Sequence, residues 1–196
     1  GARAARARLA LCQRYAVARN AVVVIVGDAA EEREGDIANR LADSRQAGEK
    51  APALPGVAAL NAGRDVLIEH PSTQSHVLMG APGVRRHDPD YFALYVGNHI
   101  LGGSGLVSRI SDEIREKRGL SYSAYSYFIP MQRKGPYTLG FQTRNDQREE
   151  ALTVLRETVQ TFIDKGPTEE ELQAAKNNIV AGFPMRVASN SKIAEY

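Results

Sequence analysis

The stretch NHILGGSGLVSRISDEIREKRGLSY, residues 98–122, decides how this chain folds. Its apolar start ends at Gly102-Gly103, and glycines in such a position commonly end a helix. Three apolar residues then recur at a spacing of four, which predicts a second helix over about residues 106–117. Gly119 follows as the cap of this helix and leads into a strand. The apolar face of the second helix consists of Leu106, Ile110 and Ile114.

The residues around this stretch predict an α+β fold. Upstream, Asp88-Pro89-Asp90 starts a helix over about residues 90–101 that is apolar most of the way round, which indicates a buried helix. Downstream, Thr168–Glu171 has the pattern of a capping box. Because no βαβ repeat occurs, we expect helices on an antiparallel sheet, in the order β-β-α-α-β-β-α-α. The predicted strands are residues 64–69, 74–79, 121–130 and 135–144, and the two long helices are residues 146–164 and 168–189.

The first 63 residues predict a separate part of the protein. Residues 46–63 combine Gly and Pro with small apolar residues, which is typical of a linker. We therefore expect residues 1–45 to be the end of a preceding domain and residues 64–196 to be a second domain, cut short at its end. The elements predicted before the linker are a helix over residues 2–18, a buried β-branched strand over 21–28 and a helix over 28–42.

Composition excludes several classes of protein. The 196 residues include Lys+Arg 25 and Asp+Glu 23, a formal charge of +2, and much of the excess lies in the first turns, which argues against a nucleic-acid-binding face. No apolar stretch approaches the roughly 20 residues of a membrane span. The single cysteine, Cys12, allows no internal disulfide and no cysteine zinc cluster. No histidine has the helical spacing of a zinc peptidase motif, so this chain is expected to hold no metal.

The strongest candidates for a binding site are Arg115 and Tyr122. Arg115 lies in the last turn of the predicted helix, and Tyr122 begins the strand after the glycine corner. A guanidinium and a phenol at one spot would offer several hydrogen-bond donors to the carbonyls of an extended peptide. The alternative is structural: Arg115 would complement the helix C-terminus, and Tyr122 would pack on the sheet.

The central stretch resembles the signature of the insulinase-type (M16) zinc peptidases, in particular their C-terminal half that binds no zinc. The resemblance extends to Asp88–Tyr91 before it and to Pro167–Leu172 with Ala175-Lys176 after it. The earlier residues Tyr15, Arg19–Val22 and Gly27-Asp28 are similar to the end of the preceding homologous domain. The resemblance therefore covers nearly the whole chain. The residues that carry it most specifically are Asn98–Gly103, Ser108–Ile110 and Glu113–Tyr122.

This resemblance implies a role in proteolysis. In the family, two α+β domains form a clamshell; one holds zinc with a His-x-x-Glu-His motif, and the other faces it with an Arg/Tyr pair that holds the substrate backbone. The pair falls on Arg115 and Tyr122. The resemblance thus implies a peptide substrate and a zinc-bearing M16 partner, on the same polypeptide or a separate subunit, while this chain, lacking the motif, would be inactive alone.

Other functions remain open at this point. The chain could act only in assembly, as the respiratory core subunits of the family do, or, less in keeping with the family, bind unfolded peptides as a chaperone. The short Gly102–Gly105 segment disfavours the substrate-holding subunit of the mitochondrial processing peptidase, which carries a long glycine-rich loop. The compartment is not set by the sequence; bacterial members of this type are often periplasmic.

Overall fold

The computed structural model describes the whole chain except Gly1, Ala29, Ala47 and Tyr196, and of Ala2 and Arg3 only the backbone. Four positions of the predicted elements therefore lie outside the described residues. Gly1 and Tyr196 are the ends of the two predicted domains, Ala29 belongs to a predicted helix, and Ala47 belongs to the predicted linker. Contacts divide the chain into two units. Residues 55–180 form the larger one, and residues 1–54 with 181–196 form the smaller one.

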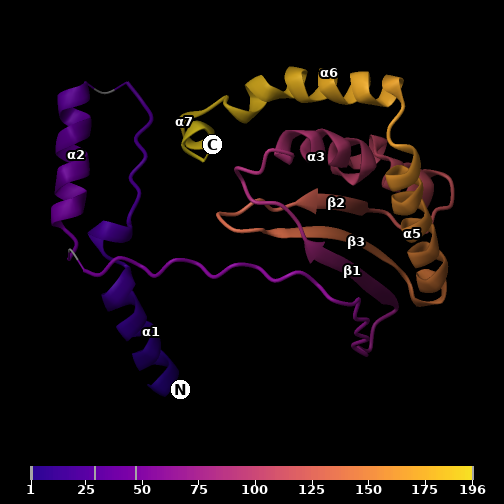
Figure 1. The fold of residues 1–196 in the computed structure, drawn as a ribbon, viewed down its shortest axis with the longest axis horizontal. Helices are drawn as coiled ribbons and strands as arrows, with labels where there is room; N and C mark the ends of the chain where they lie inside the picture. The colour runs from indigo at the N-terminus through magenta and orange to yellow at the C-terminus, as the bar shows by residue number, and fades with distance from the viewer. Residues whose placement is uncertain (1, 29, 47, 196) are drawn as a thin grey trace. The chain divides into compact units, whose positions relative to one another are not determined.

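The larger unit is built on a three-stranded antiparallel sheet. β3 (Pro136–Arg144) lies in the centre, with β1 (Gln74–Pro82) on one side and β2 (Ala124–Phe128) on the other, as Figure 1 shows. Phe141 of β3 faces Val77 of β1 and Ala124 of β2. The three strands confirm the predicted strands over 74–79, 121–130 and 135–144, and with the helices they confirm the α+β class.

Helices pack against this sheet and enclose the core. α3 (Tyr91–Asn98) continues into the wide turn η2 (His99–Gly103), and α4 (Arg109–Ser111) continues into a second wide turn, η4 (Asp112–Glu116). The long helices are α5 (Arg148–Lys165) and α6 (Glu169–Arg186), and α6 crosses the division between the units. The 3-10 turns are η3 (Gly105–Val107) and η5 (Asn145–Gln147). The core joins Leu101, Ile110, Ile114, Leu120, Ala124, Leu139, Phe141, Ala151, Val154 and Leu155.

The predicted strand over residues 64–69 is wrong. These residues, all described, form no strand, and Val66, Leu67 and Ile68 are 63–82% exposed. A strand exists only through pairing, and in the larger unit β1 pairs with β3 rather than with the segment before it. The larger unit therefore has one strand, not two, ahead of its first helix.

Two predictions about helix faces also need correction. The helix that contains α3 is not buried all round, because Phe92 is 76% exposed and burial begins only at Ile100. The next helix begins at Arg109 rather than near residue 106. Ser108 caps it by accepting a hydrogen bond from the Ser111 amide, and Leu106 lies outside it and is exposed.

The smaller unit consists of helices and extended segments. Asn20 ties them together: its side chain donates to the carbonyls of Tyr15 and Glu49 and accepts from the Ala51 amide. The predicted buried strand over 21–28 is wrong, because residues 21–26, all described, pair with no strand, and Val22 is 89% exposed. The elements of this unit are α1 (Ala2–Tyr15), η1 (Ala18–Asn20), α2 (Glu31–Asp43) and α7 (Asn190–Ala194).

The described helices include none that combines the length and the apolar character needed to cross a bilayer. The described residues between 46 and 63 lie in no helix or strand.

The capping box at the start of α6 is confirmed, because the Thr168 amide donates to the Glu171 carboxylate and the Glu171 amide donates to the Thr168 hydroxyl.

Gly102 lies where a helix turn meets β2, and we expect it to tolerate no side chain. A Cβ there would lie 2.3 Å from the Ser126 hydroxyl oxygen and 2.6 Å from the Ser126 backbone nitrogen. Gly102→Ala should therefore lower the free energy of unfolding by about 1–3 kcal/mol in urea denaturation followed by circular dichroism.

Gly97→Ala is the matched control. Its Cβ would meet nothing closer than 3.9 Å, and alanine favours the helix, so stability should stay the same or rise by up to about 1 kcal/mol. Equal losses in the two variants would contradict the close packing of η2 on β2.

Candidate functional site

Arg115 and Tyr122, the two predicted site residues, lie together in the structure. The guanidinium carbon of Arg115 is 5.1 Å from the centre of the Tyr122 ring, a distance at which a cation and an aromatic face attract each other. Tyr122 is 84% exposed, whereas the side chain of Arg115 is 26% exposed. The pair is thus accessible, with the cation against the ring and the ring open to solvent.

The glycine corner brings these side chains together. Gly119 has a φ of 62°, a left-handed conformation that glycine adopts at little cost. Its amide donates to the Arg115 carbonyl at 2.9 Å, and the Leu120 amide donates to the Ile114 carbonyl at 2.8 Å. Because Ile114 and Leu120 are both buried in the core, the corner is anchored on each side. The chain therefore reverses within a few residues and returns Tyr122 to the end of η4.

Two buried hydroxyls near the pair were not predicted from the sequence. Thr143 donates from its hydroxyl to the Leu120 carbonyl, and the Ser121 hydroxyl lies 2.7 Å from the Gln142 carbonyl. Both contacts join the corner to β3, about twenty residues away in the chain. No local sequence pattern signals them, because they depend on the register of β3.

The guanidinium of Arg115 retains capacity for a ligand. Its Nη1 lies 3.3 Å from a carboxylate oxygen of Glu116, and the Glu116 side chain is 55% exposed. An ion pair this exposed is worth about 0–1 kcal/mol, and it engages only part of the five N–H donors of arginine. A carbonyl or carboxylate can therefore bind Arg115 without displacing a strong internal partner.

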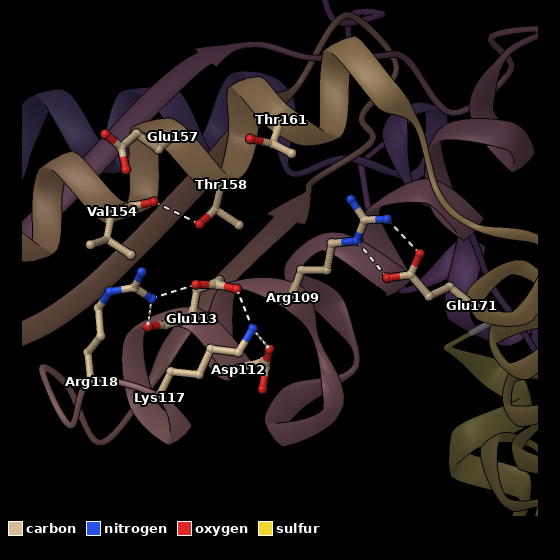
Figure 2. Close-up of a pocket in the computed structure, with 10 residues that line it drawn as sticks. All are labelled: Arg109, Asp112, Glu113, Lys117, Arg118, Val154, Glu157, Thr158, Thr161 and Glu171. Carbon is tan, nitrogen blue, oxygen red and sulfur yellow. Dashed lines mark hydrogen bonds and ion pairs between the residues drawn. The ribbon is translucent and has the colours of Figure 1, made fainter.

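A polar hollow of about 430 Å³ lies between η4 and α5, but its charged side chains are largely bonded to one another. Figure 2 shows Glu113 between Lys117 and Arg118, and Arg109 facing Glu171. Hydrogen bonds from Lys117 and Arg118 lower the pKa of Glu113. Because these charges compensate each other, the hollow supports the helices rather than offering a charged site.

The Arg109–Glu171 pair is bidentate. Nε and Nη2 of Arg109 each donate to a Glu171 oxygen at 2.6 Å, and Nη2 also donates to the Gly166 carbonyl at 3.1 Å. The guanidinium lies 5.1 Å from the centre of the Phe162 ring. These bonds join α4 to the turn between α5 and α6 and thereby hold the helices behind the glycine corner.

Metal ligands are lacking in the part of the chain that the structure describes: no group of three or more His, Cys, Asp or Glu residues could hold an ion there. The geometry provides hydrogen-bond donors at Arg115 and Tyr122.

Comparison with known proteins identifies the family. The family model described as the peptidase M16 inactive domain matches residues 9–179. The chain belongs to this family. This confirms the resemblance found in the sequence, and it confirms that the chain is an inactive M16 domain of zinc-protease-like proteins.

Individual relatives agree with this assignment. An uncharacterized zinc protease of Streptomyces coelicolor is 38% identical over 114 residues, which are 58% of this chain and 25% of that protein. A non-peptidase homolog of Helicobacter pylori is 32% identical over 117 residues, or 58% of this chain and 26% of that protein. The crystal structure of a peptidase M16 inactive domain from Pseudomonas fluorescens is 36% identical with a TM-score of 0.78, covering 86% of this chain and 40% of that one. The chain thus spans a quarter to two fifths of these proteins.

Acid should weaken the Arg109–Glu171 contact. The hydrogen bonds from Arg109 lower the pKa of Glu171 from 4.5 to about 2. A carboxylate whose pKa is lower in the folded state than in the unfolded state stabilises the fold at pH values above its usual pKa. For Glu171 this stabilisation disappears as the pH falls from about 4.5 to about 2. Because the two side chains are 22% and 31% exposed, we expect Glu171→Gln to lower the free energy of unfolding at pH 7 by about 1–2 kcal/mol.

The measurement is urea denaturation of both proteins between pH 7 and pH 2, over which the difference between them should shrink toward zero. Glu157→Gln, an exposed carboxylate of the same hollow, is the control and should change stability by no more than about 0.5 kcal/mol. A difference between Glu171→Gln and the unmodified chain that is independent of pH would contradict this role of the carboxylate.

Proposed function

We propose that this chain is the peptide-holding half of an M16-type zinc endopeptidase, and that Arg115 and Tyr122 contact the backbone of the peptide. The observation that carries the proposal is the contact between a partly buried guanidinium and an exposed phenol at the glycine corner. Membership of the M16 inactive-domain family and the similarity to named zinc proteases support it.

The zinc of such an enzyme belongs on another domain or subunit. Bound there, it would polarise the scissile carbonyl and activate water. Arg115 and Tyr122 supply N–H and O–H donors, which can bind peptide carbonyl oxygens and stabilise the negative charge that develops during attack. The guanidinium and the ring lie against each other, and their mutual position matters because an error of about 1 Å in positioning can cost roughly a hundredfold in rate.

The domain organisation forms part of the proposal. We infer that residues 1–45 end a preceding M16-like domain, that residues 46–63 are a linker and that residues 64–196 belong to the C-terminal inactive domain. In support, Val17 is the one buried apolar side chain among the described residues of the smaller unit. The exposed valines of residues 22–24 have the composition of a strand that pairs elsewhere.

A non-catalytic role in assembly is the second candidate. It is favoured by the similarity to the Helicobacter pylori protein, whose name describes a non-peptidase homolog. In that role the sheet and helices would serve contacts between subunits, and Arg115 and Tyr122 would only stabilise the corner. The presence or absence of a partner domain with His-x-x-Glu-His distinguishes the two candidates.

Removing either donor should slow peptide cleavage by the complete zinc peptidase. Arg115→Ala and Tyr122→Phe are each expected to raise the barrier by about 2.7–4 kcal/mol, the usual effect of losing one donor to a developing oxyanion. The measurement is kcat/KM on a fluorogenic peptide, with zinc content determined in parallel and expected to be unchanged.

Tyr127→Phe and Arg156→Ala are the matched controls. Tyr127 is a partly exposed phenol of β2, and Arg156 is a half-exposed arginine of α5. The two control substitutions therefore remove a phenol hydroxyl and a guanidinium at positions outside the Arg115–Tyr122 pair. Their kinetics should match those of the unmodified enzyme. If Arg115→Ala and Tyr122→Phe behave like these controls, the peptide-holding role is lost and the assembly role stands.

A further inference from the structure

We propose that Thr143 and Ser121 are positioning residues that fix Tyr122 against Arg115. Their hydroxyls hold the two residues that precede Tyr122: Thr143 donates to the Leu120 carbonyl, and the Ser121 hydroxyl lies 2.7 Å from the Gln142 carbonyl and 2.8 Å from the Ser123 carbonyl. The catalytic consequence of this inference depends on the proposed function, whereas the geometric part does not.

The position of these contacts in the sheet is the reason for the assignment. The ladder between β2 and β3 begins at the pair Ala124–Phe141 and continues toward Phe128. Gln142 and Thr143 lie beyond this first pair, where β3 is paired on its other side with β1. Residues 120–123 therefore have no ladder bonds to β3, and the two hydroxyls take the place of the missing main-chain bonds.

Burial makes these hydrogen bonds effective. Leu120 and Thr143 are each 3% exposed and Ser121 is 6% exposed, so water competes little for their polar groups. The Ser121 oxygen also accepts a hydrogen bond from the Ser123 amide, which closes a tight loop around Tyr122. The backbone of this segment is thus held firmly from β3.

The side chain of Tyr122 has no comparable support of its own. Because Tyr122 is 84% exposed, packing does not fix its ring, and the position of the ring follows from the backbone and from the contact with Arg115. Loss of the Thr143 hydroxyl leaves a buried Leu120 carbonyl without its donor, and the segment will shift to regain one. Tyr122 then moves away from Arg115, although neither residue has been changed.

The first test uses the 196-residue chain and does not depend on any activity. Aromatic rings shift the NMR signals of protons above their faces upfield, so the δ-methylene protons of Arg115 report the position of the Tyr122 ring. Tyr122→Leu defines the signal without the ring. Thr143→Val, which keeps the shape but loses the hydroxyl, should lose at least half of the upfield shift, whereas Thr143→Ser, which keeps the hydroxyl, should retain it.

Controls separate positioning from general loss of stability. Thr158→Val removes another buried hydroxyl, which donates to the Val154 carbonyl within α5, and should leave the Arg115 signal unchanged. If Thr143→Val does not fold, Ser121→Ala provides the same measurement. Retention of the full upfield shift in folded Thr143→Val, or in Ser121→Ala where Thr143→Val does not fold, would overturn the inference.

The second test uses the complete zinc peptidase. Thr143→Val should lower kcat by about ten- to a hundredfold with a smaller change in KM, because positioning errors of about 1 Å cost rates of this order. Combined with Tyr122→Phe it should cause little further loss, since it acts through Tyr122. Multiplicative losses in the double variant would contradict the inference.

The two tests fail in distinguishable ways. If Tyr122→Phe leaves the kinetics unchanged, the proposed function is wrong, and the NMR measurement still decides whether Thr143 positions Tyr122. If Tyr122→Phe slows cleavage while Thr143→Val does not, the proposed function holds and the positioning inference is wrong.

Discussion

The pairing of β3 with a strand on each side is the constraint on which the larger unit depends. Phe141 lies between Val77 and Ala124 in the sheet and is 3% exposed, so the same residue fixes two registers and contributes to the core. The register then determines which residues of β3 extend past Ala124, the first residue of β2, and these include Gln142 and Thr143. A shift by one residue would turn the core-facing side chains of β3 to the opposite face and remove both hydroxyl contacts.

Local patterns predicted the parts of the fold that local interactions determine. The glycine corner, the capping box and the long helices α5 and α6 each involve residues close together in the chain, and each is present. The proximity of Arg115 and Tyr122 follows from the same kind of local pattern, because a helix end, a glycine and a strand start within eight residues allow few arrangements. Their role in binding stays a prediction. Their actual separation still required the structure.

The two strand predictions that failed share a physical cause, which is that strands depend on partners. The segments 21–28 and 64–69 have the composition of strands, and in the structure neither pairs with another segment. Composition describes how well a residue suits a sheet, but only a neighbouring strand satisfies its backbone amides and carbonyls. The hydroxyl contacts of Thr143 and Ser121 escaped prediction for the same reason, since they follow from a long-range register rather than from their own neighbours.

The contacts around Arg115 and Tyr122 divide into rigid and exchangeable ones, and this division is what the proposed peptide-holding role requires. The contacts behind the pair are buried or well bonded: Ile114, Leu120 and the two hydroxyls fix the backbone. The contacts in front of it are weak, because the ion pair between Arg115 and Glu116 is partly exposed and worth about 0–1 kcal/mol. A ligand carbonyl that takes the place of Glu116 therefore loses little of its binding energy to displacement, while the donors it meets need little reorganisation. A firm backbone with lightly engaged donors is the arrangement that electrostatic stabilisation of a developing charge requires.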